Sequence, residues 1–151
     1  MTAQSLMHHG LEQSARRFGD RDFIRADDDR WSFRTVDALS NAFTRHLAAS
    51  GVTAGDRVVV MTTSRVEFVV AVHAVSKVGA SAVLLSPAWK AVEVEHALAL
   101  TRPVHAVADG PAVAVLSGRI RGGVSDLDDA STMEAAFTLD REPVTAGDVG
   151  D

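Results

Sequence analysis

Strand-like and helix-like segments alternate between residues 57 and 109, and this alternation limits the possible folds more than any other feature of the chain. Residues 57–62, 82–85 and 104–108 are short apolar runs, and residues 66–78 form a helix-like segment that is apolar on almost every side. Continuous apolar strands are typical of a parallel sheet that is buried on both faces. Strands that alternate with helices form right-handed βαβ units. We therefore predict an α/β fold of three layers, a mostly parallel sheet with helices on both faces.

The residues on either side of this core are predicted to form smaller elements. A helical pattern covers residues 5–18, and two strand-like runs, 22–25 and 30–33, flank a polar turn. A second amphipathic helix is predicted over residues 36–50. The predicted parts of the chain are an N-terminal helix and short β-hairpin (1–34), a βαβ core (35–110) and a weaker α/β extension (111–151).

The composition excludes several classes of protein. A hydrophobic content of 46% is too high for a disordered chain, and the absence of cysteine excludes disulfide scaffolds, iron–sulfur clusters and thiol nucleophiles. The net charge is −5 and no basic patch is present, so we predict no nucleic-acid partner. No apolar run approaches the ~20 residues of a membrane-spanning helix. Residues 1–10 lack the pattern of a secretory signal, so we predict a cytoplasmic protein.

Two groups of side chains resemble metal ligands, and a simpler interpretation is favoured for each. Residues 27–29 are three consecutive aspartates, whose side chains diverge, so a solvated hairpin turn is the better interpretation. His8, His9 and Glu12 form the second group, but adjacent residues on a helix point about 100° apart. We therefore predict no metal site.

The chain also lacks familiar catalytic and phosphate-binding motifs, including G-x-G-x-x-G, G-x-x-x-x-G-K-[ST] and G-x-S-x-G. Ligands of open parallel sheets bind beyond the carboxyl ends of the strands. Ser64, Arg65 and Trp89 follow predicted strands, and they are the candidate residues for the edge of a pocket. Ser64 also heads a helix, where free N–H groups attract anions. The favoured interpretation is structural: Ser64 and Glu67 form a capping box, and Trp89 packs against its neighbours.

Several motifs occur in a specific order and spacing over residues 6–110. Residues 51–60 read G-V-T-A-G-D-R-V-V-V, residues 67–71 read E-F-V-V-A, residues 77–80 read K-V-G-A, and residues 85–87 read L-S-P, with Trp-Ser-Phe at 31–33. In this order the motifs resemble those of the adenylate-forming enzymes, the AMP-dependent synthetases and ligases that include the acyl-CoA synthetases. The resemblance implies the N-terminal subdomain of the adenylate-forming fold.

The resemblance also implies a reaction. Acyl-CoA synthetases activate a small carboxylic acid with ATP and Mg²⁺ through an acyl-adenylate, and then transfer the acyl group to coenzyme A. The nucleotide-binding segment and the catalytic lysine of this family correspond to positions beyond residue 151. No catalytic, cofactor-binding or metal-ligating residue is therefore assigned in this chain. We predict an N-terminal fragment of an acyl-CoA synthetase (a fatty-acid or other carboxylic acid–CoA ligase) that is inactive alone and binds none of these cofactors tightly.

The chain departs from the family pattern at three local positions. Thr63-Ser64-Arg65 stands where the family usually has Pro-Asn-Ser, which changes the shape of a loop. Thr35 replaces the acidic residue of one helix-capping box, and Lys90 replaces the capping hydroxyl of another. These differences alter local stability and leave the predicted fold intact.

Two other functions stay open. In the first, the chain is a stand-alone, non-catalytic interaction module derived from this fold. A homodimer is then expected, because helix faces and sheet edges that the rest of an enzyme normally covers would associate. In the other, a flavodoxin-like protein, the isolated chain would bind a flavin or nucleotide tightly.

Overall fold

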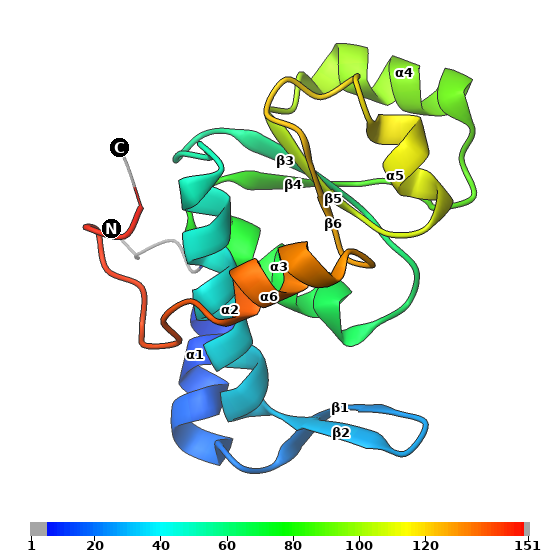
Figure 1. Ribbon diagram of the computed structural model, residues 1–151. Coiled ribbons are helices and arrows are strands. Elements are labelled where there is room, and N and C mark those ends of the chain that lie inside the picture. Colours follow the sequence, from blue (N-terminus) through cyan, green and yellow to red (C-terminus); the bar gives the residue numbers. More distant parts are fainter. Residues whose placement is uncertain (1–5, 150–151) are drawn as a thin grey trace.

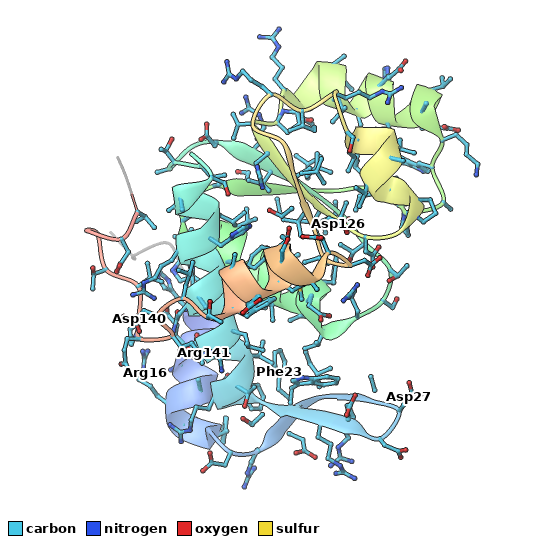
Figure 2. The ribbon with its side chains drawn as sticks, in the orientation of Figure 1. Arg16, Phe23, Asp27, Asp126, Asp140 and Arg141 are labelled. Atoms are coloured by element: carbon cyan, nitrogen blue, oxygen red, sulfur yellow. The ribbon has the colours of Figure 1, made fainter. Side chains whose placement is uncertain are left out.

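The structure is a computed structural model that describes residues 6–149 (Figure 1). Its N-terminal part is a helix, a hairpin and a long helix, and Asp27 lies at the tip of the hairpin (Figure 2). Ser32 caps the long helix because its Oγ accepts a hydrogen bond from the N–H of Thr35 at 3.1 Å. The elements are α1 (Met7–Phe18), β1 (Asp22–Ala26), β2 (Asp29–Ser32) and α2 (Phe33–Ala49).

Four parallel strands form the central sheet in the order β4-β3-β5-β6, and each strand is followed by a helix. This topology confirms the predicted α/β fold with a parallel sheet. The alternating elements are β3 (Arg57–Met61), α3 (Val66–Lys77), β4 (Ser81–Leu84), α4 (Ala91–Thr101), β5 (His105–Ala108), α5 (Pro111–Leu116), β6 (Val124–Asp126) and α6 (Ala130–Phe137).

Helices cover both faces of the sheet, and the side chains of β3 alternate between them. Val58 and Val60 belong to the core on the face covered by α2 and α3. Val59 and Met61 belong to a second core on the face covered by α4 and α5. Figure 1 shows α4 and α5 on one side of the strands and α2, α3 and α6 on the other. Burial on both faces explains why the strand reads as a continuous apolar run.

A close backbone approach positions β6 beside β5. The N–H of Gly122 donates to the carbonyl of Val104 at 2.8 Å. A Cβ on Gly122 would overlap that carbonyl oxygen, so the turn into β6 requires a glycine here. From this contact at their amino ends the two strands run in parallel, so the loop after β6 lies next to the loop after β5.

The predicted capping box at Ser64 is wrong. The N-cap of α3 is Arg65, and no side chain caps this helix. Glu67 accepts hydrogen bonds from the guanidinium of Arg65 instead, at 2.8 Å from Nε, so its carboxylate does not reach back to the chain before the helix. A cation next to the carboxylate therefore outcompetes the backbone N–H.

Most boundaries differ from the predicted ones by one to three residues. α2 begins at Phe33, before the predicted residue 36, because the Ser32 cap starts the helix immediately after β2. The predicted start of the first helix, Ser5, lies outside the described residues. No helix among residues 6–149 is long and apolar enough to cross a membrane.

Candidate functional site

The loops that follow β3, β4, β5 and β6 all lie at the carboxyl edge of the sheet, since the four strands are parallel. Ligands of open α/β sheets bind at this edge. The loops contain residues 62–65, 85–90, 109–110 and 127–129. They form two structures: an ion cluster around Arg65 and a hollow between β3 and β4.

Arg65 is the centre of the ion cluster. Its guanidinium donates to Glu67 and to Asp128, each at 2.8 Å, and to Asp109 at 3.4 Å. A further bond reaches the carbonyl of Leu127 at 3.4 Å. The hydrogen bond to Glu67, followed by those to Asp128 and Asp109, raises the pKa of Arg65 above its usual range. One cation therefore joins the loops after three strands.

Asp109 is the buried member of the cluster, with a side chain that is only 3% exposed. Its carboxylate accepts from the N–H of Thr63 at 2.9 Å and from the Thr63 hydroxyl at 2.6 Å. Asp128 accepts from the N–H of Gly110 at 2.8 Å, and this bond together with Arg65 holds the pKa of Asp128 below its usual range. The cluster thus satisfies its carboxylates with internal donors and fixes the positions of these loops.

The hollow lies beside the cluster, between the ends of β3 and β4. Its volume is about 320 Å³. Its lining combines four hydroxyl-bearing residues with four apolar ones: Thr62, Thr63, Ser64 and Ser86, and Phe68, Leu84, Leu85 and Pro87. A hollow of this composition suits a small, partly apolar molecule.

The three predicted pocket-edge residues occupy different places. Ser64 lines the hollow, whereas Arg65 is engaged in the ion cluster. Trp89 lines a second, larger groove of about 630 Å³ along α4, together with Val92 and Leu100. The structure does not bring the three side chains into one pocket.

Sequence reasoning missed the partners of Arg65. Asp109 follows a predicted strand and Asp128 lies in an acidic tract, but neither position indicates what it contacts. The hydrogen bonds from Arg65 span 44 residues to Asp109 and 63 residues to Asp128. Only the strand order, which places β5 between β3 and β6, brings these residues together.

Three of the histidines, His8, His46 and His105, and the acidic residue Glu12 have structural partners. His8 Nδ1 lies 2.8 Å from the Ser76 hydroxyl, and Glu12 accepts from the buried ammonium of Lys77 at 2.8 Å. His46 Nε2 and His105 Nε2 both lie 2.8 Å from the hydroxyl of Ser125. Burial lowers the pKa of both His46 and His105. His46 and His105 therefore connect α2 and β5 to β6 through the hydroxyl of Ser125.

The carboxyl edge does not fit the ATP and Mg²⁺ that the family resemblance implies. Its guanidinium, Arg65, already faces three carboxylates, so this part of the edge repels a triphosphate. Within residues 6–149, no group of three or more His, Cys, Asp or Glu residues is arranged to hold a metal ion. No step of a nucleotide reaction is therefore assigned to these residues.

Comparisons with known proteins identify related sequences. The chain is 29% identical over 148 residues to the medium/long-chain-fatty-acid–CoA ligase FadD6 of Mycobacterium tuberculosis, a match that covers 91% of this chain and 25% of that protein. It is 36% identical over 92 residues to the phosphinothricin tripeptide synthetase PhsC of Streptomyces viridochromogenes, which covers 61% of this chain and 8% of that protein. The chain therefore spans a quarter or less of the length of these two relatives.

A solved structure has the same fold. The anthranilate CoA ligase AuaEII, in complex with anthranoyl-AMP, matches 94% of this chain and 29% of its own chain with a TM-score of 0.83 at 20% identity. The sequence also matches the AMP-binding enzyme family over residues 11–148. The chain belongs to this family of adenylate-forming, AMP-binding enzymes.

Proposed function

We propose that this chain is the N-terminal part of a carboxylic acid–CoA ligase, which activates its acid as an acyl-adenylate. One observation carries the choice of a ligase over a peptide-synthetase adenylation domain. The match to the fatty-acid–CoA ligase extends over 91% of the chain, whereas the match to the tripeptide synthetase extends over 61%. A fatty acid is the substrate class that the name of the first relative supports.

The role of these residues in such a ligase is structural. The sheet and its two helical layers support the carboxyl-edge loops, and the Arg65 cluster fixes those loops relative to one another. We propose that Ser64 and its hollow of about 320 Å³ form part of the wall of the acid or CoA entrance, with Trp89 in the adjoining groove. The chemical groups that act on ATP belong to the rest of the ligase.

The test is an assay at two levels. The purified 151-residue chain is assayed for acid-dependent ATP–pyrophosphate exchange, and we expect none, because the guanidinium of Arg65 at the carboxyl edge is already paired with carboxylates. Exchange by this chain would contradict the proposed scaffold role.

The second level uses the complete product of the gene, read through the codon for Asp151. We expect acid-dependent exchange followed by formation of a CoA thioester. Transfer of the acyl group only to the phosphopantetheine of a carrier protein would overturn the ligase proposal in favour of a peptide-synthetase domain.

A second candidate function is supported by the exposed face of α4. Val92 is 77% exposed and Leu100 is 71% exposed, and both lie along the same groove as Trp89. Apolar side chains in this arrangement are typical of an interface. An interaction module that uses this face would self-associate. A stop codon directly after Asp151, together with a concentration-dependent dimer in sedimentation, would favour this second function.

A further inference from the structure

A second hollow, of about 360 Å³, lies away from the carboxyl edge, between α1, the first turns of α2 and residues 141–143. Three guanidinium-bearing residues line it: Arg16 from α1, Arg34 from α2 and Arg141 from the C-terminal segment. Figure 2 shows Arg16 and Arg141 beside each other, next to α1 and α2. These residues come from three distant parts of the sequence, so the fold itself gathers the positive charge.

The wall formed by residues 141–143 is held in place by Arg45. Its guanidinium donates to the carbonyl of Asp140 at 2.9 Å, of Glu142 at 2.8 Å and of Pro143 at 3.4 Å. The same side chain forms an ion pair with Asp148 at 3.1 Å. Arg45, which is partly buried, therefore organises a segment without regular secondary structure and places Arg141 beside the hollow, where Nη2 of Arg141 donates to the carbonyl of Phe137 at 3.0 Å.

Asn41 provides a second, independent observation. It lines the hollow, is only 2% exposed, and its Nδ2 donates to the carbonyl of Arg141 at 3.0 Å. Its Oδ1 is buried without a hydrogen-bond partner among the residues that the structure describes. Rotation of the amide would place Oδ1 against that carbonyl, so the orientation is determined by the contact. A buried acceptor without a donor costs about 1–3 kcal/mol, so the site favours a ligand that supplies one.

The charges around this hollow favour an anion. The carboxylate of Asp37 also lines it, but it already accepts from the ammonium of Lys77 at 2.9 Å. Asp20 pairs with Arg34 at 3.1 Å, but both side chains are exposed, so the pair is weak. Glu142 is the remaining carboxylate of the lining and lies on the exposed segment. Three arginines thus line the hollow together with two carboxylates, of which Asp37 shares the buried ammonium of Lys77 with Glu12.

We propose that this hollow binds a small phosphate-bearing molecule whose phosphate carries a hydroxyl donor. The guanidinium groups of Arg16, Arg34 and Arg141 bind the phosphate oxygens, since the planar fork of arginine matches an oxyanion. The Oδ1 of Asn41 accepts a hydrogen bond from the hydroxyl of the phosphate, which gives this buried oxygen the donor that it lacks. Hydrogen phosphate carries both features, whereas sulfate at neutral pH offers the oxygens without the hydroxyl. This site is separate from the proposed CoA-ligase function and does not depend on it.

The test compares inorganic phosphate with sulfate at equal ionic strength, in titrations of the folded 151-residue chain followed by NMR. We expect phosphate to shift the Asn41 side-chain amide and the backbone amides of residues 141–142, and to bind more tightly than sulfate. Glycerol 3-phosphate is a third probe, because its phosphate group is mostly a dianion without a P–OH at neutral pH: weaker binding than inorganic phosphate supports the hydroxyl contact, and tighter binding would overturn it. Equal shifts with phosphate and sulfate, or no shift at these residues, would overturn the proposal.

Three variants and one control sharpen the result. Arg16→Ala and Arg141→Ala remove exposed side chains that line the hollow, and each is expected to weaken phosphate binding about tenfold. Arg17→Ala is the control, because it removes the same charge from the same helix outside the hollow. Asn41→Leu is expected to abolish the preference for phosphate over sulfate. An equal effect of Arg17→Ala and Arg16→Ala, or an unchanged preference in a folded Asn41→Leu variant, would contradict a built site.

Discussion

The carboxyl edge of the sheet and the hollow beside α1 and α2 use arginine in opposite ways. At the edge, the guanidinium of Arg65 pairs with three carboxylates of the protein itself, so it is not available to a ligand. Three arginines line the hollow, where Arg34 has only an exposed carboxylate as its partner, and of the carboxylates in the lining Asp37 is bound to Lys77. The difference indicates that the position predicted by sheet topology stabilises loops, whereas a position that no rule of topology indicates has the charge to bind a ligand. Four predictions test this contrast, from the largest effect to the smallest.

The largest effect is expected for Arg65→Met. This change leaves Asp109, which is 3% exposed, without its cation, while the apolar stem of the side chain is kept. Removing one partner of a buried ion pair is strongly destabilising, and partial exposure of Arg65 reduces the loss to about 2–3 kcal/mol. Urea unfolding measures the difference, with Arg119→Met as the control at an exposed pair with Glu95. A loss equal to that of the control would show that the cluster contributes little to stability.

A smaller effect on stability, about 1–2 kcal/mol, is expected for Arg45→Leu, because charged hydrogen bonds to three carbonyls and to Asp148 are lost. The same change releases Arg141 from the hollow, so phosphate binding is expected to be weakened along with stability. Arg65→Met, in contrast, is expected to leave phosphate binding unchanged. Phosphate titration of both folded variants in the absence of urea distinguishes the arginine that supports the hollow from the arginine that stabilises the carboxyl edge.

The third prediction concerns pH. The pKa of Asp128 is lowered by the N–H of Gly110 and by Arg65, so the folded state binds this proton more weakly than the unfolded chain does. The contribution of ionised Asp128 to the free energy of unfolding is fully present above its pKa in the unfolded chain, about 3.8. It is lost as the pH falls through the lower pKa of Asp128 in the folded state. The stability difference between the wild type and Arg65→Met should therefore narrow below about pH 3.8. Urea midpoints measured at pH 7 and at successively lower pH values give this difference, and a constant gap would contradict the assignment.

The smallest effect on stability is expected for Asp20→Ala. The ion pair between Asp20 and Arg34 is exposed, so its loss changes the free energy of unfolding by less than about 0.5 kcal/mol. Phosphate binding should nevertheless become tighter, because Arg34 loses a competing carboxylate. Asp22→Ala, in the hairpin, is the matched removal of an acidic residue outside the hollow. Tighter binding in both variants would assign the gain to overall charge.

The contrast also explains what the sequence could predict. The parallel sheet and its two helical layers follow from periodicity, because the central strands β3 and β5 place apolar side chains in the cores on both faces. The capping box at Ser64 was wrongly predicted because Arg65, one residue further on, captures Glu67. Periodicity carries no information about such a competition between side chains.

The hollow could not be predicted for a different reason. Its wall includes residues 141–143, which have no periodic pattern, and Arg45 holds them across about 95 residues of sequence. The sequence shows Arg45 on a predicted helix and a polar C-terminal segment, but nothing in either indicates that the two are in contact. Contacts of this length depend on where the helices pack.

The spacing of three residues on α2 has a consequence for how this protein tolerates insertions. Asp37, Asn41 and Arg45 follow one another at intervals of four residues, and they hold Lys77, the carbonyl of Arg141 and the segment around Asp148. A single residue inserted into α2 before Asp37 would rotate this row by about 100° relative to the preceding part of the helix. Three distant parts of the chain would then lose their attachment together. An insertion at the exposed hairpin tip near Asp28 would disturb none of them, so length variation in natural or designed versions of this chain belongs there.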